Sequence, residues 1–78
     1  MNWQLLQNVK PNTGKIILLH VKDCCYFARL LRRKDGQEIM AVSYTFKPLL
    51  DIKNEMLPSF TLEQLYHWKA YWSLYTKP

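Results

Sequence analysis

The chain has 78 residues, enough for one domain around one small hydrophobic core, and we expect residues 1–78 to form that domain. Hydrophobic residues make up 49% of the chain and aromatic residues 14%, a composition that excludes intrinsic disorder. Eleven lysines and arginines against six acidic residues give a net charge of +5, which favours an anionic partner such as nucleic acid or an acidic protein face.

No targeting or membrane segment is evident in the sequence. The N-terminal residues lack the basic stretch and apolar run of a signal peptide, and the longest apolar run, IILLHV (16–21), is too short to cross a membrane. We therefore expect a cytoplasmic protein that does not contact membranes. In that compartment its two cysteines stay as thiols.

The first half of the chain predicts three antiparallel strands. Residues 10–15 (KPNTGK) have the composition of a turn, and the apolar run 15–21 that follows is typical of a strand. Residues 22–23 turn the chain into a second strand, 24–33. The pair Asp35-Gly36 then predicts a tight hairpin into a third strand, 38–46.

The hairpin fixes a predicted register, which a one-residue slip or a bulge would change. With Asp35-Gly36 as a two-residue loop, Arg33 faces Glu38 as an ion pair and Arg29 faces Val42. Arg29 is then the unexpected residue, because it lies on the apolar face. That face is predicted to be the core side of the sheet and carries Phe27, Leu31, Met40, Val42 and Tyr44.

The second half predicts less regular structure. Residues 47–60 are irregular between Pro48 and Pro58, and residues 61–68 begin like a short helix. Its capping box would join Thr61 to Gln64, and the aromatic tail (70–78) suits a last edge strand or an extended segment. The predicted fold is mainly β with a minor α part. It is either a small SH3-like half-open barrel or an antiparallel sheet of about four strands with one short helix near 61–68.

A pattern at both ends of the chain resembles a known family. Trp3 is followed by Pro11-x-x-Gly14 and an apolar strand, and the chain closes on Y71-W72-S73-L74-Y75-T76-K77-P78. This resembles a domain-of-unknown-function family of short phage and prophage proteins, which close on His-Trp-x-x-Leu-Pro-x-Pro. Tyr71, Tyr75 and Thr76 stand where that family favours His, Leu and the first Pro. The resemblance implies a small β-rich domain from a mobile element, of a kind that often binds and blocks host machinery, including defence systems.

The sequence contains no pattern typical of a catalytic or metal site. Cys24 and Cys25 are adjacent on a strand and point to opposite faces, so they cannot easily converge on one ion with His20 or His67. We expect them to be structural thiols in a buried strand. His67 has no evident nucleophile or paired carboxylate, and there is no phosphate-binding glycine loop or nucleophile elbow. We therefore predict a non-enzymatic protein without a cofactor.

Two groups of residues are the candidate binding site. The first group is basic and lies on the hairpin and its approach: Lys22, Arg29, Arg32, Arg33 and Lys34. These residues suit phosphate or carboxylate groups, but they also suit the solvated tip of a hairpin. The second group comes from the aromatic C-terminal part and comprises Trp68, Lys69 and Trp72, which fit stacking or a protein interface.

These observations predict a non-enzymatic binding protein of phage or prophage type. It would sterically block or redirect a host protein or ribonucleoprotein, for example as an inhibitor of a host defence or restriction system. The alternative is a β-domain that binds nucleic acid directly through the basic hairpin and an aromatic surface. A third class is a small structural protein of the virion. We expect a monomer or a small homo-oligomer.

Overall fold

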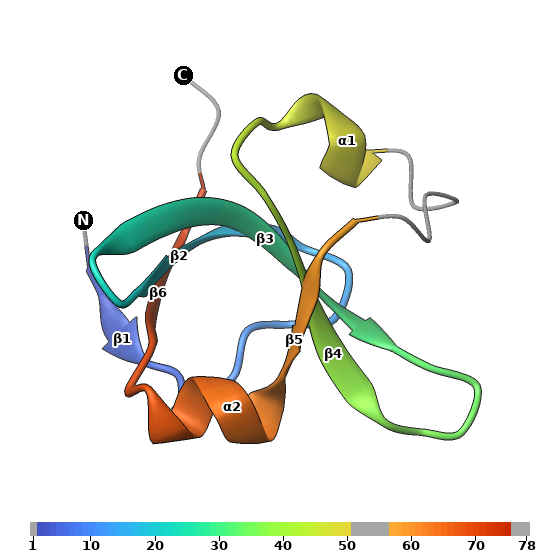
Figure 1. Ribbon diagram of the computed structural model, residues 1–78, viewed down its shortest axis with the longest axis horizontal. Helices are drawn as coiled ribbons and strands as arrows, with labels where there is room; N and C mark the ends of the chain where they lie inside the picture. The colour runs from blue at the N-terminus through green and yellow to red at the C-terminus, as the bar shows by residue number, and fades with distance from the viewer. Residues whose placement is uncertain (1, 51–56, 76–78) are drawn as a thin grey trace.

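The computed structural model describes residues 2–50 and 57–75 and has the predicted mainly β class (Figure 1). The described residues form six strands, where about four were predicted, and a second short helix. The strands are β1 (Gln4–Leu5), β2 (Ile16–Val21), β3 (Cys24–Arg32), β4 (Glu38–Ser43), β5 (Ser59–Thr61) and β6 (Tyr71–Leu74); the helices are α1 (Lys47–Leu50) and α2 (Leu62–His67).

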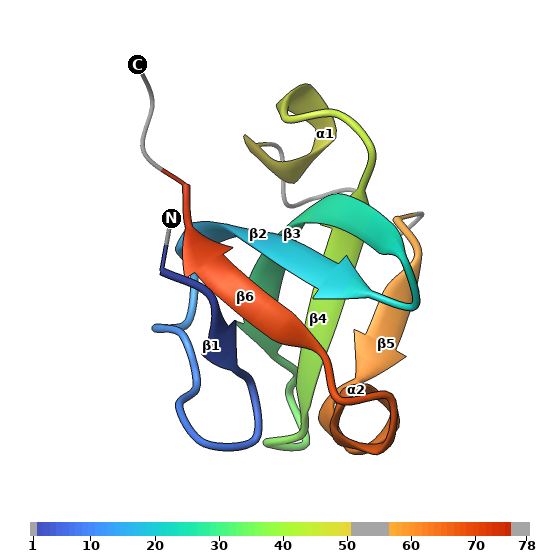
Figure 2. The ribbon, with the colours of Figure 1, turned by 90° about the vertical axis from the view of Figure 1, so that its left-hand side faces the viewer.

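The strands form one antiparallel sheet in the order β1-β6-β2-β3-β4-β5. In a flat sheet, the four steps from β6 to β5 would separate these strands by about 19 Å. The six residues of α2, which rise only about 9 Å, and a short turn connect them. The sheet is therefore curled, and α2 lies across the gap between β5 and β6 (Figure 2).

The chain's last strand differs from its prediction. The aromatic tail was predicted to be an edge strand or an extended segment, but β6 lies inside the sheet, between β1 and β2. The short strands β1 and β5, with two and three residues, form the edges instead. Strands of that length carry no measurable alternation of apolar and polar residues, so the sequence pattern could not reveal them.

The two-residue hairpin turn that was predicted at Asp35-Gly36 occurs instead at the preceding hairpin, at Lys22-Asp23. Lys22 and Asp23 both have positive φ, 49° and 65°, as a two-residue type I′ turn requires between the paired residues Val21 and Cys24. The β3–β4 loop is instead longer than the predicted two residues. Arg33 N–H donates to the Gln37 carbonyl at 2.8 Å, and Gly36, with φ of 87°, donates to the Arg33 carbonyl at 2.9 Å. This is a type I turn followed by a left-handed glycine, the usual form of a three-residue hairpin loop.

The longer loop shifts the β3–β4 register by one residue. Arg32 now pairs with Glu38 and Leu30 with Met40, so the predicted pairs, including Arg33 with Glu38, are wrong. A shift of one residue moves side chains to the opposite face of a strand. Met40 and Val42 are in the core as predicted, but they share it with Ala28 and Leu30. Of the other predicted core residues, Phe27 and Leu31 lie on the opposite face of the sheet, and Tyr44 is 74% exposed.

The core lies inside the curl of the sheet and is closed by α2. Thr61 caps α2 and forms the predicted capping box with Gln64, which directs Leu65 into the core. Trp72 also lies there, and its indole N–H donates to the Val9 carbonyl at 2.6 Å. The cluster consists of Leu6, Ile17, Leu19, Val21, Ala28, Leu30, Met40, Val42, Leu65, Ala70 and Trp72.

Candidate binding surfaces

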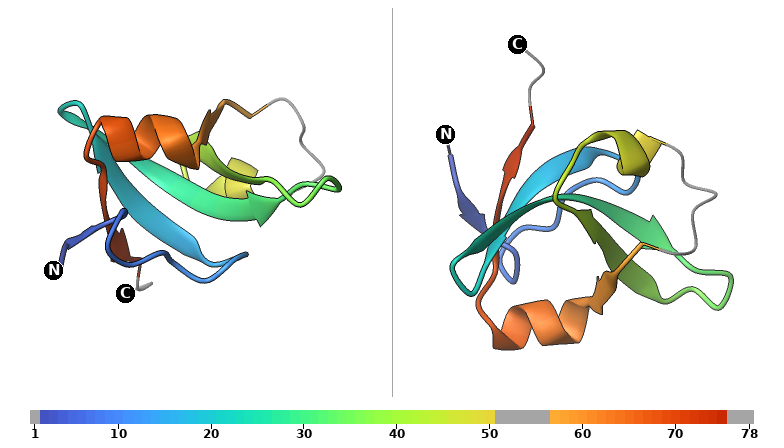
Figure 3. Two further views of the ribbon diagram at one scale, coloured as in Figure 1. Left: turned by 90° about the horizontal axis from the view of Figure 1, so that it is seen from below. Right: turned by 45° about the horizontal axis from the view of Figure 1, so that its top comes forward.

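The predicted binding residues do not form one site. Lys22 and Trp68 meet where the β2–β3 turn approaches the end of α2, and the exposed Lys69 follows Trp68. Arg32, Arg33 and Lys34 lie at the opposite end of β3, whose nine residues span about 26 Å. Figure 3 shows the β2–β3 turn and α2 at one end of the molecule and the β3–β4 loop at the other.

Arg29 has a structural role. It lies on the outer face of β3 and not on the core face where it was predicted, because the register is shifted. Its Nη1 donates to the carbonyl of Leu49 in α1 at 2.9 Å, and its Nε is buried with no hydrogen-bond partner among the described residues. A cation at this position is stabilised by the free carbonyl groups at a helix C-terminus. Arg29 therefore ties β3 to α1.

Trp72 also differs from its prediction as a binding residue. Its side chain is 4% exposed and belongs to the core. The aromatic tail alternates between the faces of β6, and Trp72 takes the inner face because its neighbour Leu19 on β2 does. Its single polar atom is satisfied by Val9, so Trp72 has no free group for a ligand.

Four aromatic side chains form a continuous row across β3, the segment after β4, β5 and the end of α2. The rings of Tyr44 and Tyr26 are 5.0 Å apart and tilted by 38°, and Tyr26 meets Phe60 edge to face at 6.1 Å. Phe60 in turn meets Trp68 at 5.5 Å and 89°. The Nζ of Lys22 lies 4.1 Å from the centroid of the Trp68 ring. We call these four rings the aromatic row.

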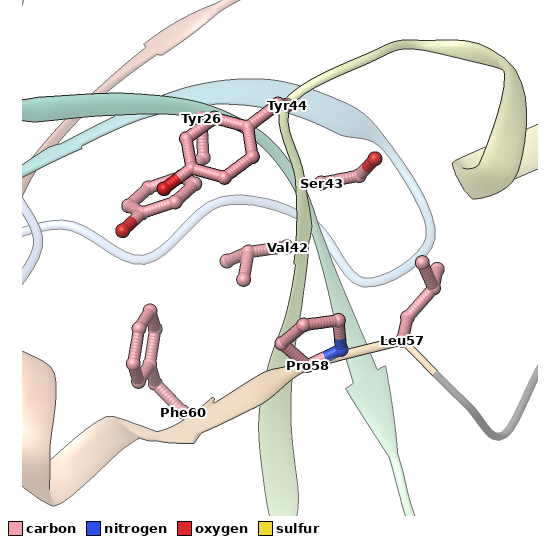
Figure 4. Close-up of a pocket in the computed structure, with 7 residues that line it drawn as sticks. All are labelled: Tyr26, Val42, Ser43, Tyr44, Leu57, Pro58 and Phe60. Carbon is pink, nitrogen blue, oxygen red and sulfur yellow. The ribbon is translucent and has the colours of Figure 1, made fainter.

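A groove of about 280 Å³ opens along the Tyr26 and Tyr44 end of the aromatic row. Figure 4 shows the two tyrosine rings side by side, with Phe60 projecting toward them from β5 across Val42. Val42 and Pro58 are joined by a backbone hydrogen bond of 2.9 Å, which fixes the floor of the groove. The lining consists of Tyr26, Val42, Ser43, Tyr44, Leu57, Pro58 and Phe60.

The polar side chains that line the groove are those of Tyr26, Tyr44 and Ser43, and the Ser43 Oγ accepts a hydrogen bond from the Thr45 N–H at 3.2 Å. The pKa of Tyr26 is raised to about 12, mainly by a hydrogen bond with the Tyr44 side chain and to a smaller extent by desolvation. Tyr26 is therefore neutral at physiological pH. A neutral phenol both donates and accepts hydrogen bonds, so the groove can bind a backbone carbonyl or amide without holding a fixed charge.

The exposed end of the β3–β4 hairpin carries three cations. Arg32, Arg33 and Lys34, which we call the basic tip, are all exposed. The predicted ion pair between Arg33 and Glu38 is absent, because Glu38 accepts from Lys10 Nζ at 2.8 Å. This hydrogen bond lowers the pKa of Glu38 and raises that of Lys10.

The cysteines and histidines do not gather into a metal-binding group in the described part of the chain. Cys24 and Cys25 are free thiols, and both are exposed, which contradicts the prediction of a buried strand at this point. They lie beside the exposed β2–β3 turn, where the strand extends past the core. Residues 2–50 and 57–75 contain no group of three or more His, Cys, Asp or Glu side chains that could hold a metal ion. His67 is exposed at the end of α2.

Sequence reasoning missed Tyr26, Tyr44 and Phe60, the centre of the aromatic row. With a three-residue loop, the β3–β4 register continues one pair beyond Phe27 and Ser43 and places Tyr26 opposite Tyr44. The sequence signal available for these two tyrosines was therefore the length of the β3–β4 loop. Phe60 lies on β5, which pairs it with Met40, and this pairing had no sequence signal. None of the helices in the described ranges is long and apolar enough to cross a membrane.

Comparison with family models, curated proteins and solved structures gives no match to this chain. The resemblance to the phage family therefore stays a prediction.

Proposed function

We propose that this domain is a non-catalytic protein-binding module whose groove holds an extended, proline-containing segment of a partner protein. The observation that supports it is the groove at the aromatic row, lined by Tyr26, Tyr44, Phe60 and Pro58. Extended polyproline segments have no internal hydrogen bonds and bind grooves lined by aromatic side chains. Of the two hydrogen-bonded tyrosines, the one that accepts keeps its own O–H free to donate to a backbone carbonyl of such a segment.

The size of the groove favours a segment over a compact small molecule. Sites that enclose a small ligand usually measure about 300–1,000 Å³ and bury most of that ligand. This groove, at about 280 Å³, falls just below that range and is bounded on one side by Tyr44, which is 74% exposed. Two or three side chains of a passing chain fit such a volume.

The geometry of the rings favours peptide over single-stranded nucleic acid. Base stacking requires free ring faces. In the aromatic row, Lys22 lies over the Trp68 ring, and Phe60 is held edge to face between Trp68 and Tyr26. Only Tyr44 is mostly exposed among the four rings.

Charge gives the bound segment a direction. At the Trp68 end of the aromatic row, the exposed Lys22 lies over the Trp68 ring and the exposed Lys69 follows that residue, with Asp23 and Glu63 as the acids nearby. An acidic residue in the partner would pair with Lys22 or Lys69 at that end, while its proline and apolar side chains occupy the groove at the Tyr44 end.

The resemblance to phage proteins gives the proposal its finer form. The partner would then be a host protein or ribonucleoprotein in the cytoplasm, and the small domain would block or redirect it sterically. While the groove holds the partner's segment, that segment cannot contact the host component that it normally binds. This steric block needs no catalytic group.

The test is selection of short random peptides displayed on a surface against the folded domain. We expect enrichment of sequences with proline and apolar residues followed by an acidic residue. Tyr44→Ala should weaken a selected peptide about tenfold, since anchor residues commonly contribute more than 1 kcal/mol. The matched control is Tyr71→Ala, because Tyr71 is 43% exposed but lies on β6, away from the groove. Absence of enrichment, or equal binding by both variants, would contradict the proposal.

A further inference from the structure

The β3–β4 hairpin forms a projecting two-stranded ribbon at the end opposite to the β2–β3 turn. All residues from 32 to 37 are exposed, and Figure 1 shows the loop extending beyond α2. Its conformation is fixed by its own hydrogen bonds. The Arg33–Gln37 and Gly36–Arg33 backbone bonds close the turn, and the Gln37 N–H donates to Asp35 Oδ1 at 2.9 Å. A ribbon ordered in this way loses little conformational entropy when it binds.

The acidic side chains near the basic tip are already engaged. Asp35 accepts a hydrogen bond from the turn backbone, and Glu38 accepts one from Lys10. Among the described residues, Glu38 forms its ion pair with Lys10. Within the same residues, Arg32, Arg33 and Lys34 form no ion pair with a carboxylate. Three neighbouring cations on an ordered loop therefore face solvent, and they are available to an external anion.

The directions of the three cations favour a groove with anionic walls over a flat acidic surface. Arg32 and Arg33 are consecutive on the ribbon, so their side chains leave opposite faces of it, and Lys34 follows in the turn. The two strands are about 4.8 Å apart, and a two-stranded ribbon fits the major groove of B-form DNA, which is about 12 Å wide. Phosphates line both sides of that groove.

We propose that the basic tip enters the major groove of duplex DNA and contacts phosphates on both sides of it through Arg32, Arg33 and Lys34. The contact depends on charge and shape and not on base sequence. It is independent of the peptide groove, because the two surfaces lie at opposite ends of β3. The domain would thus hold a protein segment at one end and DNA at the other.

The experiment is fluorescence anisotropy of a labelled DNA duplex of about 20 base pairs, titrated with the protein between about 50 and 200 mM salt. The test variant is Arg33→Gln/Lys34→Gln. The matched control is Lys22→Gln/Lys69→Gln at the other end, which removes the same two positive charges from the net charge of +5. Any difference between the variants then reports position and not total charge.

We expect the tip variant to bind DNA about tenfold more weakly at the lowest salt concentration. The slope of log K against log salt should fall by about 1.8, since each lost phosphate contact removes about 0.9. The control should lose less than half of that slope. A peptide selected by the groove should bind the tip variant unchanged, which separates failure of this proposal from failure of the proposed function.

Four results would overturn the proposal. They are absence of DNA binding at the lowest salt concentration, equal losses in both variants, and equally tight binding of single-stranded DNA or A-form RNA duplex. The fourth is displacement of DNA by poly-glutamate at the same concentration of charge, which would assign the tip to an acidic protein. The A-form duplex is informative because its major groove is too narrow and deep for the ribbon.

Discussion

The aromatic row and the basic tip lie at opposite ends of β3, and they differ in how far binding and stability are coupled. Tyr26, Phe60 and Trp68 pack against the hydrophobic core, so the side chains that form the groove also stabilise the fold. The tip is exposed and is held by backbone hydrogen bonds within its own turn. Substitutions in the row should therefore change stability and binding together, whereas substitutions in the tip should change binding alone.

The largest effect is expected for Phe60→Ala, at the centre of the aromatic row. Phe60 contacts both Tyr26 and Trp68 and packs against the core, so its removal should cost about 3 kcal/mol in urea unfolding. Peptide binding should fall by more than tenfold, while DNA binding by the tip stays unchanged where the variant is folded. Tyr71→Ala is the control and should cost less than about 1 kcal/mol. A loss for Phe60→Ala no greater than this would show that the row is not coupled to the core.

The next-largest effect is expected for Arg29→Met, and Arg32→Met on the same strand is the variant to compare with it. Arg29→Met removes the hydrogen bond to the Leu49 carbonyl and should destabilise the fold by about 1–2 kcal/mol, with DNA binding unchanged. Arg32→Met removes the same charge from an exposed position and should have the opposite pattern, with weaker DNA binding and stability within about 0.5 kcal/mol. Urea unfolding and anisotropy on both variants provide the comparison. If Arg29→Met weakens DNA binding as much as Arg32→Met, the structural assignment of Arg29 is wrong.

The elements that could be predicted from the sequence are those specified by neighbouring residues. The apolar run of β2 and the capping box of Thr61 and Gln64 are local patterns, and both are confirmed. Asp35-Gly36 predicted a hairpin correctly but not its loop length, because glycine with positive φ serves both two-residue and three-residue loops. That single residue of difference moved Arg29 to the other face.

The candidate surfaces follow the same division. The basic tip was predictable because its cations are consecutive in the sequence. The aromatic row joins residues 26, 44, 60 and 68, which meet only through the β3–β4 register, the pairing of β5 and the curl of the sheet. None of these is specified by local pattern. The exposed Tyr44 was accordingly assigned to the core and Trp72 to the surface.

A smaller effect is expected at Gly36, where the tip depends on backbone conformation. Gly36 has φ of 87°, and a Cβ there would meet no atom within 4 Å, so alanine is strained but not obstructed. Gly36→Ala should cost about 1 kcal/mol and weaken DNA binding by distorting the turn. Gly36→Asn, which tolerates positive φ, should restore most of both losses. Equal DNA binding by the alanine variant and the wild type would mean that the ordered turn does not contribute to the contact.

The smallest effect concerns the Lys10–Glu38 ion pair at the base of the tip. The pKa of Glu38 is lowered in the folded protein, so the stabilisation is present above its ordinary value of 4.5 and is lost as pH falls through the lower folded pKa. The stability of the wild type should thus fall more steeply below pH 4.5 than that of Glu38→Gln. At neutral pH the same variant removes a negative charge beside Arg32 and frees Lys10, so its DNA binding should be tighter than the wild type's. Glu63→Gln on α2 makes the same change in net charge far from the tip, and should leave DNA binding closer to the wild type's if the tip itself makes the contact.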